Sequence, residues 1–437
     1  MSDILLLEPG SSSKRRCYSE IFITPKRASQ PSLADIKTQL REVRDYSVTH
    51  QDALVNELIT GMATSPEVEV TFAADAGHAV NIIREISGNS PIATNKSAVV
   101  TRELVPPLVS AGSPVIESYY DEFKPFENRF SEYWQLPDMI FESLWRSFER
   151  SIDLSILRKR SAQINGAKDF VGLMGVNAIS AKEGSVVMLQ HMSNIGKIFE
   201  QAREIILVAG LDKIVRNLDE AVLQAKCMAV FGSEALPLTF QNKAGCERSI
   251  DVLPFRKPSQ STGKIHLILL DNGRNQILQS GYKDLLACIG CRACIKVCPA
   301  SRYFAEDTRL SPKEYIYFFI SGKNPSVERC LQCKSCEANC PLNIDVPGMI
   351  LEARELMSKK HRPLSDHLLS NVEVLEGLGS TMPWLASVVS NSRLLRWLGE
   401  KMTGISRERD IPRMQRGTFA KWFRSIEKRV EGDGGHG

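Results

Sequence analysis

The chain contains two copies of a cysteine pattern whose spacing is typical of cubane iron–sulfur clusters. The first copy is CIGCRACIKVCP, which begins at Cys288, and the second is CLQCKSCEANCP, which begins at Cys330. Each reads C-x2-C-x2-C-x3-C-P, and thirty-one residues separate Cys298 from Cys330. Three cysteines on one tight turn can bind three irons of a single cube. The pattern therefore predicts two clusters, each of the 4Fe–4S type.

The fourth cysteine of each copy is followed by a proline and should point back toward the other cube. In two-cluster ferredoxins this cysteine is a ligand of the second cluster, and the same arrangement is expected here. The expected ligands of the first cluster are Cys288, Cys291, Cys294 and Cys340. The expected ligands of the second cluster are Cys330, Cys333, Cys336 and Cys298.

Structural zinc and disulfide bonds are the alternative uses of such cysteines. Zinc sites usually combine two separated C-x2-C pairs or use histidine, whereas residues 288–341 contain no histidine. Disulfides between such close neighbours would be short and strained. The pattern therefore favours clusters. Three further cysteines, Cys17, Cys227 and Cys246, are scattered and are predicted to be core or surface residues without a ligand role.

Composition places the chain among ordinary globular proteins. It has 437 residues, of which 43% are apolar and 24% charged, enough for two or three domains. The net charge of +4 is too small to indicate a nucleic-acid partner. The sequence has no run of eighteen apolar residues and no signal-peptide pattern, so it predicts neither a membrane span nor export. A reducing, cytoplasmic setting is expected, which suits cluster thiolates.

The elements that must position the cysteines follow from hydrophobic periodicity. Between residues 67 and 271, short apolar segments alternate with helical patterns, which favours a mostly parallel sheet in a layered α/β domain. Strands are expected in EVEVTFA, SPVIESY, GSVVMLQ, EIILVAG and KIHLILLD. Helices are expected around 79–86, 140–148 and 214–223, and again from Pro347 onward with Met349, Ile350, Ala353 and Leu356 facing inward.

Four segments are predicted along the chain. Residues 1–32 form a basic, extended or partly disordered arm, 33–275 the α/β domain, 276–360 the cluster module, and 361–437 a helical region with a basic tail. The α/β domain and the cluster module should pack together, because no Gly-Ser linker separates them. The stretch 384–402 is amphipathic. It could pack on its own core, or contact a membrane surface or an acidic partner.

Two residues outside the cysteine motifs are candidates for a substrate site. Lys96 follows an expected strand in the loop TNKSAVVT, and ligands of open α/β sheets bind beyond the carboxyl ends of strands. It could pair with a carboxylate, with Ser97 adding a hydrogen bond. Glu183 precedes another strand and could act as a base. His191 could move a proton. Solvated or structural roles remain open for all of them.

Several segments resemble the lactate-utilisation iron–sulfur proteins, which carry a LUD domain before a ferredoxin-type module. They are VTFAADAGHAVNIIREI, NKSAVVTREL, GAKDFVGLMGVNAISAKEGSVVMLQHMSN, REIILVAGLDKIVRNLDEA and DIPRMQRGTFAKWF. The resemblance implies a LUD domain of the NagB/RpiA/CoA-transferase-like class, followed by an α-helical ferredoxin with a helix in the spacer between the motifs. It also implies a cysteine-rich partner subunit and a smaller LUD protein that act together in the oxidation of lactate to pyruvate.

Three functions are compatible with these features. The first is an electron-transfer subunit of a cytoplasmic oxidoreductase complex, which works with a cysteine-rich subunit and a flavoprotein. In the second, the LUD domain is itself a hydroxy-acid dehydrogenase site that uses Lys96 and Glu183. The third is a non-catalytic docking scaffold, which the segment 182–185 and the long basic tail suggest. It would carry the clusters in a heterodisulfide-reductase-like complex, because PSVERCLQCKSCEANCP is similar to the small ferredoxin subunit of heterodisulfide reductases.

Overall fold

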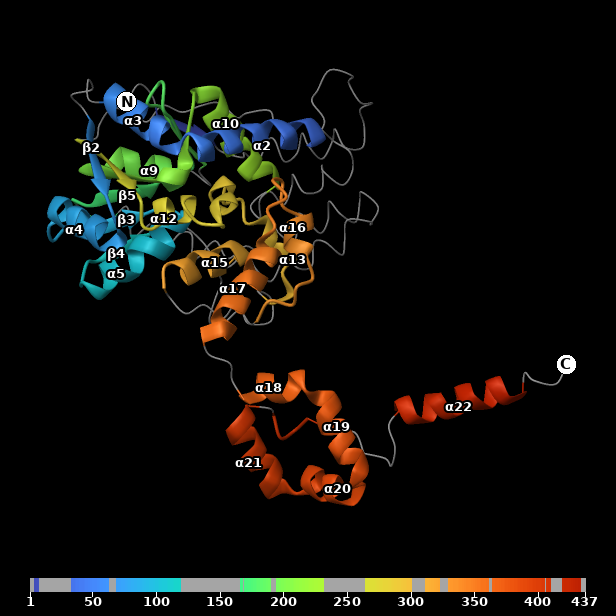
Figure 1. Cartoon of the computed structure of the whole chain (residues 1–437). Helices are drawn as coiled ribbons and strands as arrows, with labels where there is room; N and C mark the ends of the chain where they lie inside the picture. The colour runs from blue at the N-terminus through green and yellow to red at the C-terminus, as the bar shows by residue number, and fades with distance from the viewer. Residues whose placement is uncertain are drawn as a thin grey trace, which may run out of the picture. The chain divides into compact units, whose positions relative to one another are not determined.

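The computed structural model describes twelve segments of the chain: residues 4–7, 33–62, 68–118, 166–167, 169–189, 194–231, 264–300, 311–322, 329–360, 364–404, 406–409 and 419–433. The chain divides into two units, Met1–Leu351 and Glu352–Gly437, which are described separately (Figure 1). The finer division into four segments stays a prediction. The helix expected around 140–148 lies outside the described residues.

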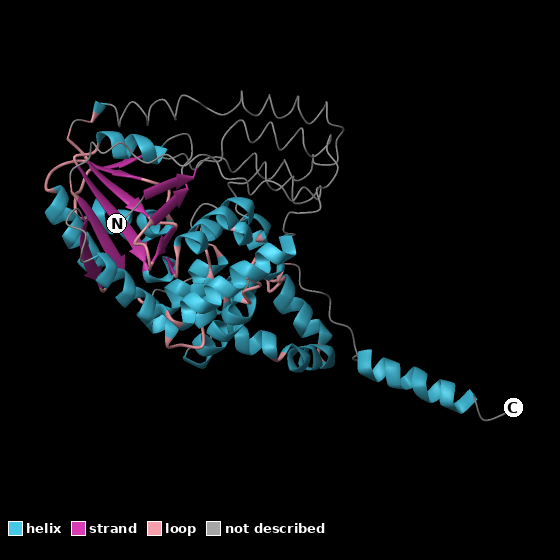
Figure 2. Ribbon diagram, turned by 90° about the horizontal axis from the view of Figure 1, so that it is seen from above, coloured by secondary structure: helices cyan, strands magenta, loops and turns pink. Residues whose placement is uncertain are grey.

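A six-stranded sheet forms the centre of the first unit, and every pair of neighbouring strands is parallel. In spatial order the strands are β2 (Val68–Ala73), β10 (Ile265–Leu270), β8 (Glu204–Gly210), β5 (Val171–Gly175), β3 (Ile92–Thr94) and β4 (Val115–Glu117). Figure 2 shows these strands with helices around them. The parallel α/β sheet expected from the sequence is therefore confirmed.

Helices cover both faces of this sheet. The covering elements are α3 (Gln51–Met62) and α9 (Asn194–Gln201) on one face, and α4 (Ala76–Ser87), the π-helical turn η1 (Val99–Leu104) and α5 (Val105–Ser110) on the other. In β8, Ile205 and Leu207 pack toward α3 and α9, whereas Ile206 and Val208 pack toward α4 and η1. Because both faces are buried, the central strands read as continuous apolar runs.

A second, four-stranded sheet lies in the same unit. It contains β1 (Ile4–Leu7), β7 (Val186–Leu189), β6 (Ala178–Ser180) and β9 (Ile214–Val215), in that order. Helices α2 (Leu33–Thr49) and α10 (Leu218–Phe231) contact it. The prediction of a helix around residues 214–223 was wrong at its start, because α10 begins at Leu218. Ile214 and Val215 pair with β6 and are buried, so their apolar character serves a strand.

The cysteine motifs lie among short helices. The described elements are α12 (Arg274–Leu278), the 3-10 turn η3 (Lys283–Ala287), α13 (Ala293–Val297), α15 (Pro312–Ile320), α16 (Ser335–Ala338) and α17 (Val346–Lys360). Helix α15 lies in the spacer between the motifs, as expected. It begins with a capping box, in which the Ser311 side chain accepts from the Glu314 N–H and Glu314 accepts from the Ser311 N–H.

The described part of the second unit consists of helices joined by short turns, which confirms the expected helical region. Its helices after α17 are α18 (Leu364–Ser370), α19 (Val372–Thr381), α20 (Pro383–Asn391), α21 (Arg393–Thr403) and α22 (Phe419–Asp433). Apolar side chains of the amphipathic stretch 384–402 are exposed, among them Val388 and Leu398. In α17, Ile350 and Ala353 are buried as expected, but Leu356 is exposed, so its predicted inward position was wrong. None of the described helices is long and apolar enough to cross a membrane.

Gly175, the last residue of β5, packs closely against the Ser97 side chain. An alanine Cβ at Gly175 would overlap the Ser97 side chain, whereas a Cβ at Gly61 in α3 would meet no atom within 4 Å. We expect Gly175→Ala to destabilise the protein by about 1–3 kcal/mol through overpacking. Gly61→Ala is the matched control and should leave stability equal or higher, because alanine favours the helix. Denaturant unfolding followed by circular dichroism measures both, and equal stability of the two variants would contradict the close packing at Gly175.

Candidate functional site

The two cysteine motifs adopt the same loop conformation. The third residue of each motif has a positive φ, 80° at Gly290 and 54° at Gln332. The fifth residue also has a positive φ, 63° at Arg292 and 58° at Lys334, and each precedes a short helix, α13 or α16. In the first motif this turn aims the Gly290 N–H at the Cys288 sulfur, 3.3 Å away. The repeated spacing therefore produces a repeated turn around each set of thiols.

The fourth cysteine of each motif lies beside the first three of the other. Helices α13 and α16 contact each other, and Figure 1 shows them side by side. A small space next to α15 is lined by four thiols, those of Cys298, Cys330, Cys333 and Cys336. On the other side, Cys340 interacts electrostatically with Cys288 and with Cys294. This arrangement matches the ligand sets expected from the sequence, which stay a prediction.

The chemistry of the thiols fits iron–sulfur clusters. Burial raises the pKa of Cys291 to about 12 and that of Cys294 well above its usual value. Such thiols remain protonated at neutral pH unless a metal displaces the proton, which coordination does outright. In the described part of the chain, no three His, Cys, Asp or Glu side chains converge on a single point. Three thiols of the first motif line one space, and Cys298 with three thiols of the second motif lines another.

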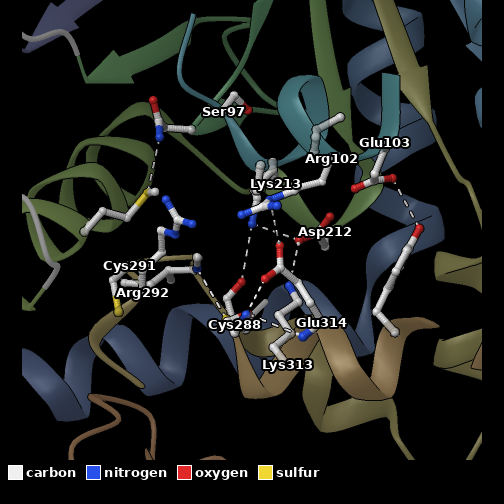
Figure 3. A pocket seen from close by; sticks show the side chains of 18 of the residues that line it. Ser97, Arg102, Glu103, Asp212, Lys213, Cys288, Cys291, Arg292, Lys313 and Glu314 are labelled. Atoms are coloured by element: carbon white, nitrogen blue, oxygen red, sulfur yellow. Dashed lines mark hydrogen bonds and ion pairs between the residues drawn. The ribbon is translucent and has the colours of Figure 1, made fainter. Parts of the chain in front are cut away.

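A cavity of about 170 Å³ separates the first motif from the six-stranded sheet. Its lining includes residues within four positions after the ends of β3, β5, β8 and β10, which are Asn95, Val176, Asp212 and Arg274. These strands are parallel, so their carboxyl ends meet at one edge, where open α/β sheets bind ligands. Figure 3 shows Ser97 on the sheet side of the cavity, Cys288 on the motif side, and charged side chains between them.

The carboxylate of Asp212 connects these charged side chains. It lies 2.5 Å from Arg274 Nε, 2.8 Å from Lys213 Nζ and 3.8 Å from Lys313 Nζ. Arg274 also pairs with Glu103, at 2.9 Å. Burial alone would raise the pKa of Asp212, but the three cations hold that pKa well below its usual value. Asp212 is therefore ionised and joins the sheet edge to helix α15.

A second connection between the sheet domain and the first motif comes from helix α2. Arg44 is almost completely buried, with 1% of its surface exposed. Its guanidinium donates to the carbonyl oxygens of Leu286 and Ala287, directly before the first cluster cysteine, at 2.8 and 3.0 Å. Lys213 Nζ donates to the carbonyl of Cys288 at 3.3 Å. The first motif is thus held by cations of the preceding domain.

The two predicted substrate residues, Lys96 and Glu183, lie at different places in the structure. Lys96 and Ser97 line the cavity, whereas Glu183 is not among its described lining residues. The Glu183 Oε2 atom instead accepts the N–H of Leu218 at 3.0 Å, at the first residue of α10. His191 lies outside the described residues. The catalytic roles of Lys96 and Glu183 stay predictions.

Several charged residues of the site were not predicted from the sequence. Asp212, Lys213 and Arg274 follow the predicted strands EIILVAG and KIHLILLD, so the rule applied to Lys96 would also have found them. Arg44 follows the buried Leu40 by one helical turn, and a charged residue on an apolar helix face is a usable signal. Cys227 is fully buried, as a core residue was predicted to be, while Cys17 and Cys246 lie outside the described residues.

Family models of known proteins match the two parts of the chain that form this site. Residues 57–270 match the family model of the LUD domain, and residues 284–344 match that of the 4Fe-4S dicluster domain. The chain combines a LUD domain with a 4Fe–4S dicluster domain. The eight-cysteine pattern of the dicluster domain implies two 4Fe–4S clusters.

The same arrangement of domains extends to curated relatives. Over 89% of its length, the LUD–dicluster chain is 23% identical to Lactate utilization protein B of Geobacillus sp., of which 87% is covered. It is 24% identical to Lactate utilization protein B of Bacillus velezensis, with 90% of this chain and 89% of the relative covered. The likeness is distant but spans both domains. No solved structure matches the chain.

The exchange of the fourth cysteines between motifs can be tested by substitution. We expect Cys298→Ser to alter the same cluster signal as Cys333→Ser, and Cys340→Ser to alter the same signal as Cys291→Ser, because each fourth cysteine lies beside the other motif. Electron paramagnetic resonance of the four reduced variants, with iron content as a control, makes the comparison. Pairing of Cys298→Ser with Cys291→Ser would instead show that each motif holds its own cluster.

Proposed function

We propose that the LUD–dicluster chain is the electron-transfer subunit of a multi-subunit oxidoreductase, similar in role to Lactate utilization protein B. The main support for this proposal is that the second motif is more exposed to solvent than the first. Cys333 is exposed and Leu331 beside it is 68% exposed, whereas Cys288 lies against the buried cations of the LUD domain. When bound, the clusters supply one-electron transfer. The chain thus offers one surface-accessible site and one inner site.

In this proposal the chain's own residues have defined tasks. The eight cysteines hold the clusters, and the aliphatic and aromatic groups around Cys298, such as Ile350 and Tyr315, limit the access of water. The exposed Leu331 gives a partner an apolar contact beside the second motif. The proposed partners are a cysteine-rich subunit and a flavoprotein, because a flavin can accept two electrons from a substrate and release them singly.

Further features of the proposal follow from the resemblance to Lactate utilization protein B. The reaction proposed for the complex is the oxidation of lactate or a related hydroxy acid in the cytoplasm. The LUD domain is assigned to the NagB/RpiA/CoA-transferase-like class and the dicluster domain to the α-helical ferredoxins. The order of a parallel sheet, short helices around the motifs and a helical C-terminal region supports these assignments.

The relay role predicts the behaviour of the isolated chain. When lactate is added anaerobically to the cluster-loaded protein, the visible cluster absorption should stay constant, because the substrate is oxidised on a partner. Addition of the partner subunits should then bleach the absorption. Dithionite serves as the control that the clusters can be reduced. Rapid bleaching by lactate alone would refute a pure relay.

A second candidate function is favoured by the cavity beside Cys288. Lys96 and Arg102 line this cavity together with the first motif, so a hydroxy acid bound there would lie next to a cluster. In that case the LUD domain would itself hold the substrate. The third possibility, a docking scaffold without substrate, would leave the cavity without a ligand.

Substitution of Lys96 distinguishes these candidates. Under the relay proposal, Lys96→Ala should change kcat/KM of the full complex by less than about twofold. If Lys96 binds a substrate carboxylate, loss of a charge-assisted hydrogen bond of about 1.5–3 kcal/mol should lower kcat/KM by roughly tenfold or more. Lys182→Ala is the matched control, because Lys182 is an exposed lysine outside the described cavity lining.

A further inference from the structure

Three consecutive carbonyl groups lead into the first cluster motif, and two buried cations, from helix α2 and from the end of strand β8, bind all three. Arg44 of helix α2 donates to the carbonyls of Leu286 and Ala287, and Lys213, which follows strand β8, donates to the carbonyl of Cys288. Both cations are buried, with 1% and 8% of their surface exposed. Helix α2 and the end of strand β8 thus bring two positive charges to the backbone at and just before Cys288.

The carboxylates of the protein compensate these charges only in part. Asp212, Asp45 and Glu220 favour the charge of Arg44, but their carboxylates accept no described hydrogen bond from it. Glu103 pairs with Arg274. The described hydrogen bonds of Arg44 all end on neutral oxygen atoms: the carbonyls of Leu286, Ala287 and Asp212 and the amide of Gln224. The Asp212 carboxylate is shared by Lys213, Arg274 and Lys313. A buried charge without a counter-charge is costly. The arrangement therefore suits an additional anion close to Cys288.

The first cluster is such an anion. Four thiolate ligands outweigh the positive charge of a 4Fe–4S cube, so the loaded site is negative and gains one further negative charge on reduction. Burial in a medium of low dielectric constant disfavours this additional charge, while nearby cations favour it. Cations next to Cys288 should therefore make the first cluster easier to reduce.

The surroundings of the second motif differ. Among the described residues that line the space beside Cys298 and Cys330, Lys334 is the one cation. Its side chain is 66% exposed and lies 3.5 Å from the carboxylate of Glu337. Solvent and this partner screen its charge. The buried cations therefore act on one of the two cluster sites.

We propose that Arg44, Lys213 and Lys313, which reach the first motif from helix α2, from the end of strand β8 and from helix α15, raise the reduction potential of the first cluster and so tune the electron relay electrostatically. These residues are positioning residues and carry no electrons themselves. The inference rests on the proposed function only in that the first cluster exchanges electrons. It gives the LUD domain a task that does not require a substrate.

The test is a redox titration of the full-length, cluster-loaded protein, followed by electron paramagnetic resonance. The signal of the first motif is identified as the one altered in Cys291→Ser. We expect Lys213→Met to reduce the equilibrium constant for reduction of this cluster about tenfold, a downward shift of about 59 mV for a one-electron couple. The second cluster should not shift. Lys213→Arg keeps the charge and should restore the potential.

Two further variants complete the test. Lys313→Met changes a side chain that is 22% exposed, on helix α15, and should lower the same potential even if Lys213→Met binds its cluster poorly. Lys334→Met is the matched control at the second motif and should leave the first cluster unchanged. Unchanged potentials in the Lys213→Met and Lys313→Met variants would overturn the proposal. Chemical mediators set the potential in this experiment, so its outcome is independent of whether a partner subunit receives electrons.

Discussion

The structure depends on a single buried carboxylate, that of Asp212, at the end of the central strand β8. Three cations from different parts of the chain reach it: Lys213 beside it, Arg274 after strand β10, and Lys313 in the spacer helix α15. Removing one member of such a buried group typically costs about 3–5 kcal/mol, because the remaining charges lose their partners. The sheet edge and the helices around the first motif are therefore held in one arrangement by electrostatics as well as by apolar packing.

This arrangement explains why a LUD domain and a dicluster domain belong to one unit of the fold. The parallel sheet brings the ends of β3, β5, β8 and β10 to a common edge, and that edge faces the first cysteine motif across the cavity. Arg44 adds a contact from the first helix of the domain, 243 residues before Ala287 in the chain. Helix α2 also contacts the chain just after the second motif, where Arg41 donates to the carbonyl of Leu342 at 3.0 Å. In the described residues, however, no buried cation lines the space beside Cys298 and Cys330, and Cys333 is exposed. The two cluster sites thus have different environments, although their loops have the same conformation.

Local patterns allowed much of the fold to be predicted. The strand runs were readable because burial on both faces makes EIILVAG and KIHLILLD continuously apolar, and the cysteine spacing specified both the cofactor type and the repeated turn. The error at Ile214 arose because a two-residue strand paired with β6 has no period of its own. Leu356 was misplaced because helical spacing alone does not show where the partner surface of α17 ends. The role of Arg44 depends on contacts distant in sequence, which no local pattern contains.

The contacts of Arg44, Lys213 and Asp212 imply that the sheet and the first cluster site form one cooperative structure. Anaerobic guanidinium unfolding of the cluster-loaded protein tests it directly, with visible absorption as the probe of the clusters and far-ultraviolet circular dichroism as the probe of the sheet. About half of the cluster absorption should persist until the sheet unfolds, because the first cluster site is anchored to the sheet edge through Arg44, Lys213 and Asp212. Loss of all cluster absorption while the circular dichroism is still native would contradict it.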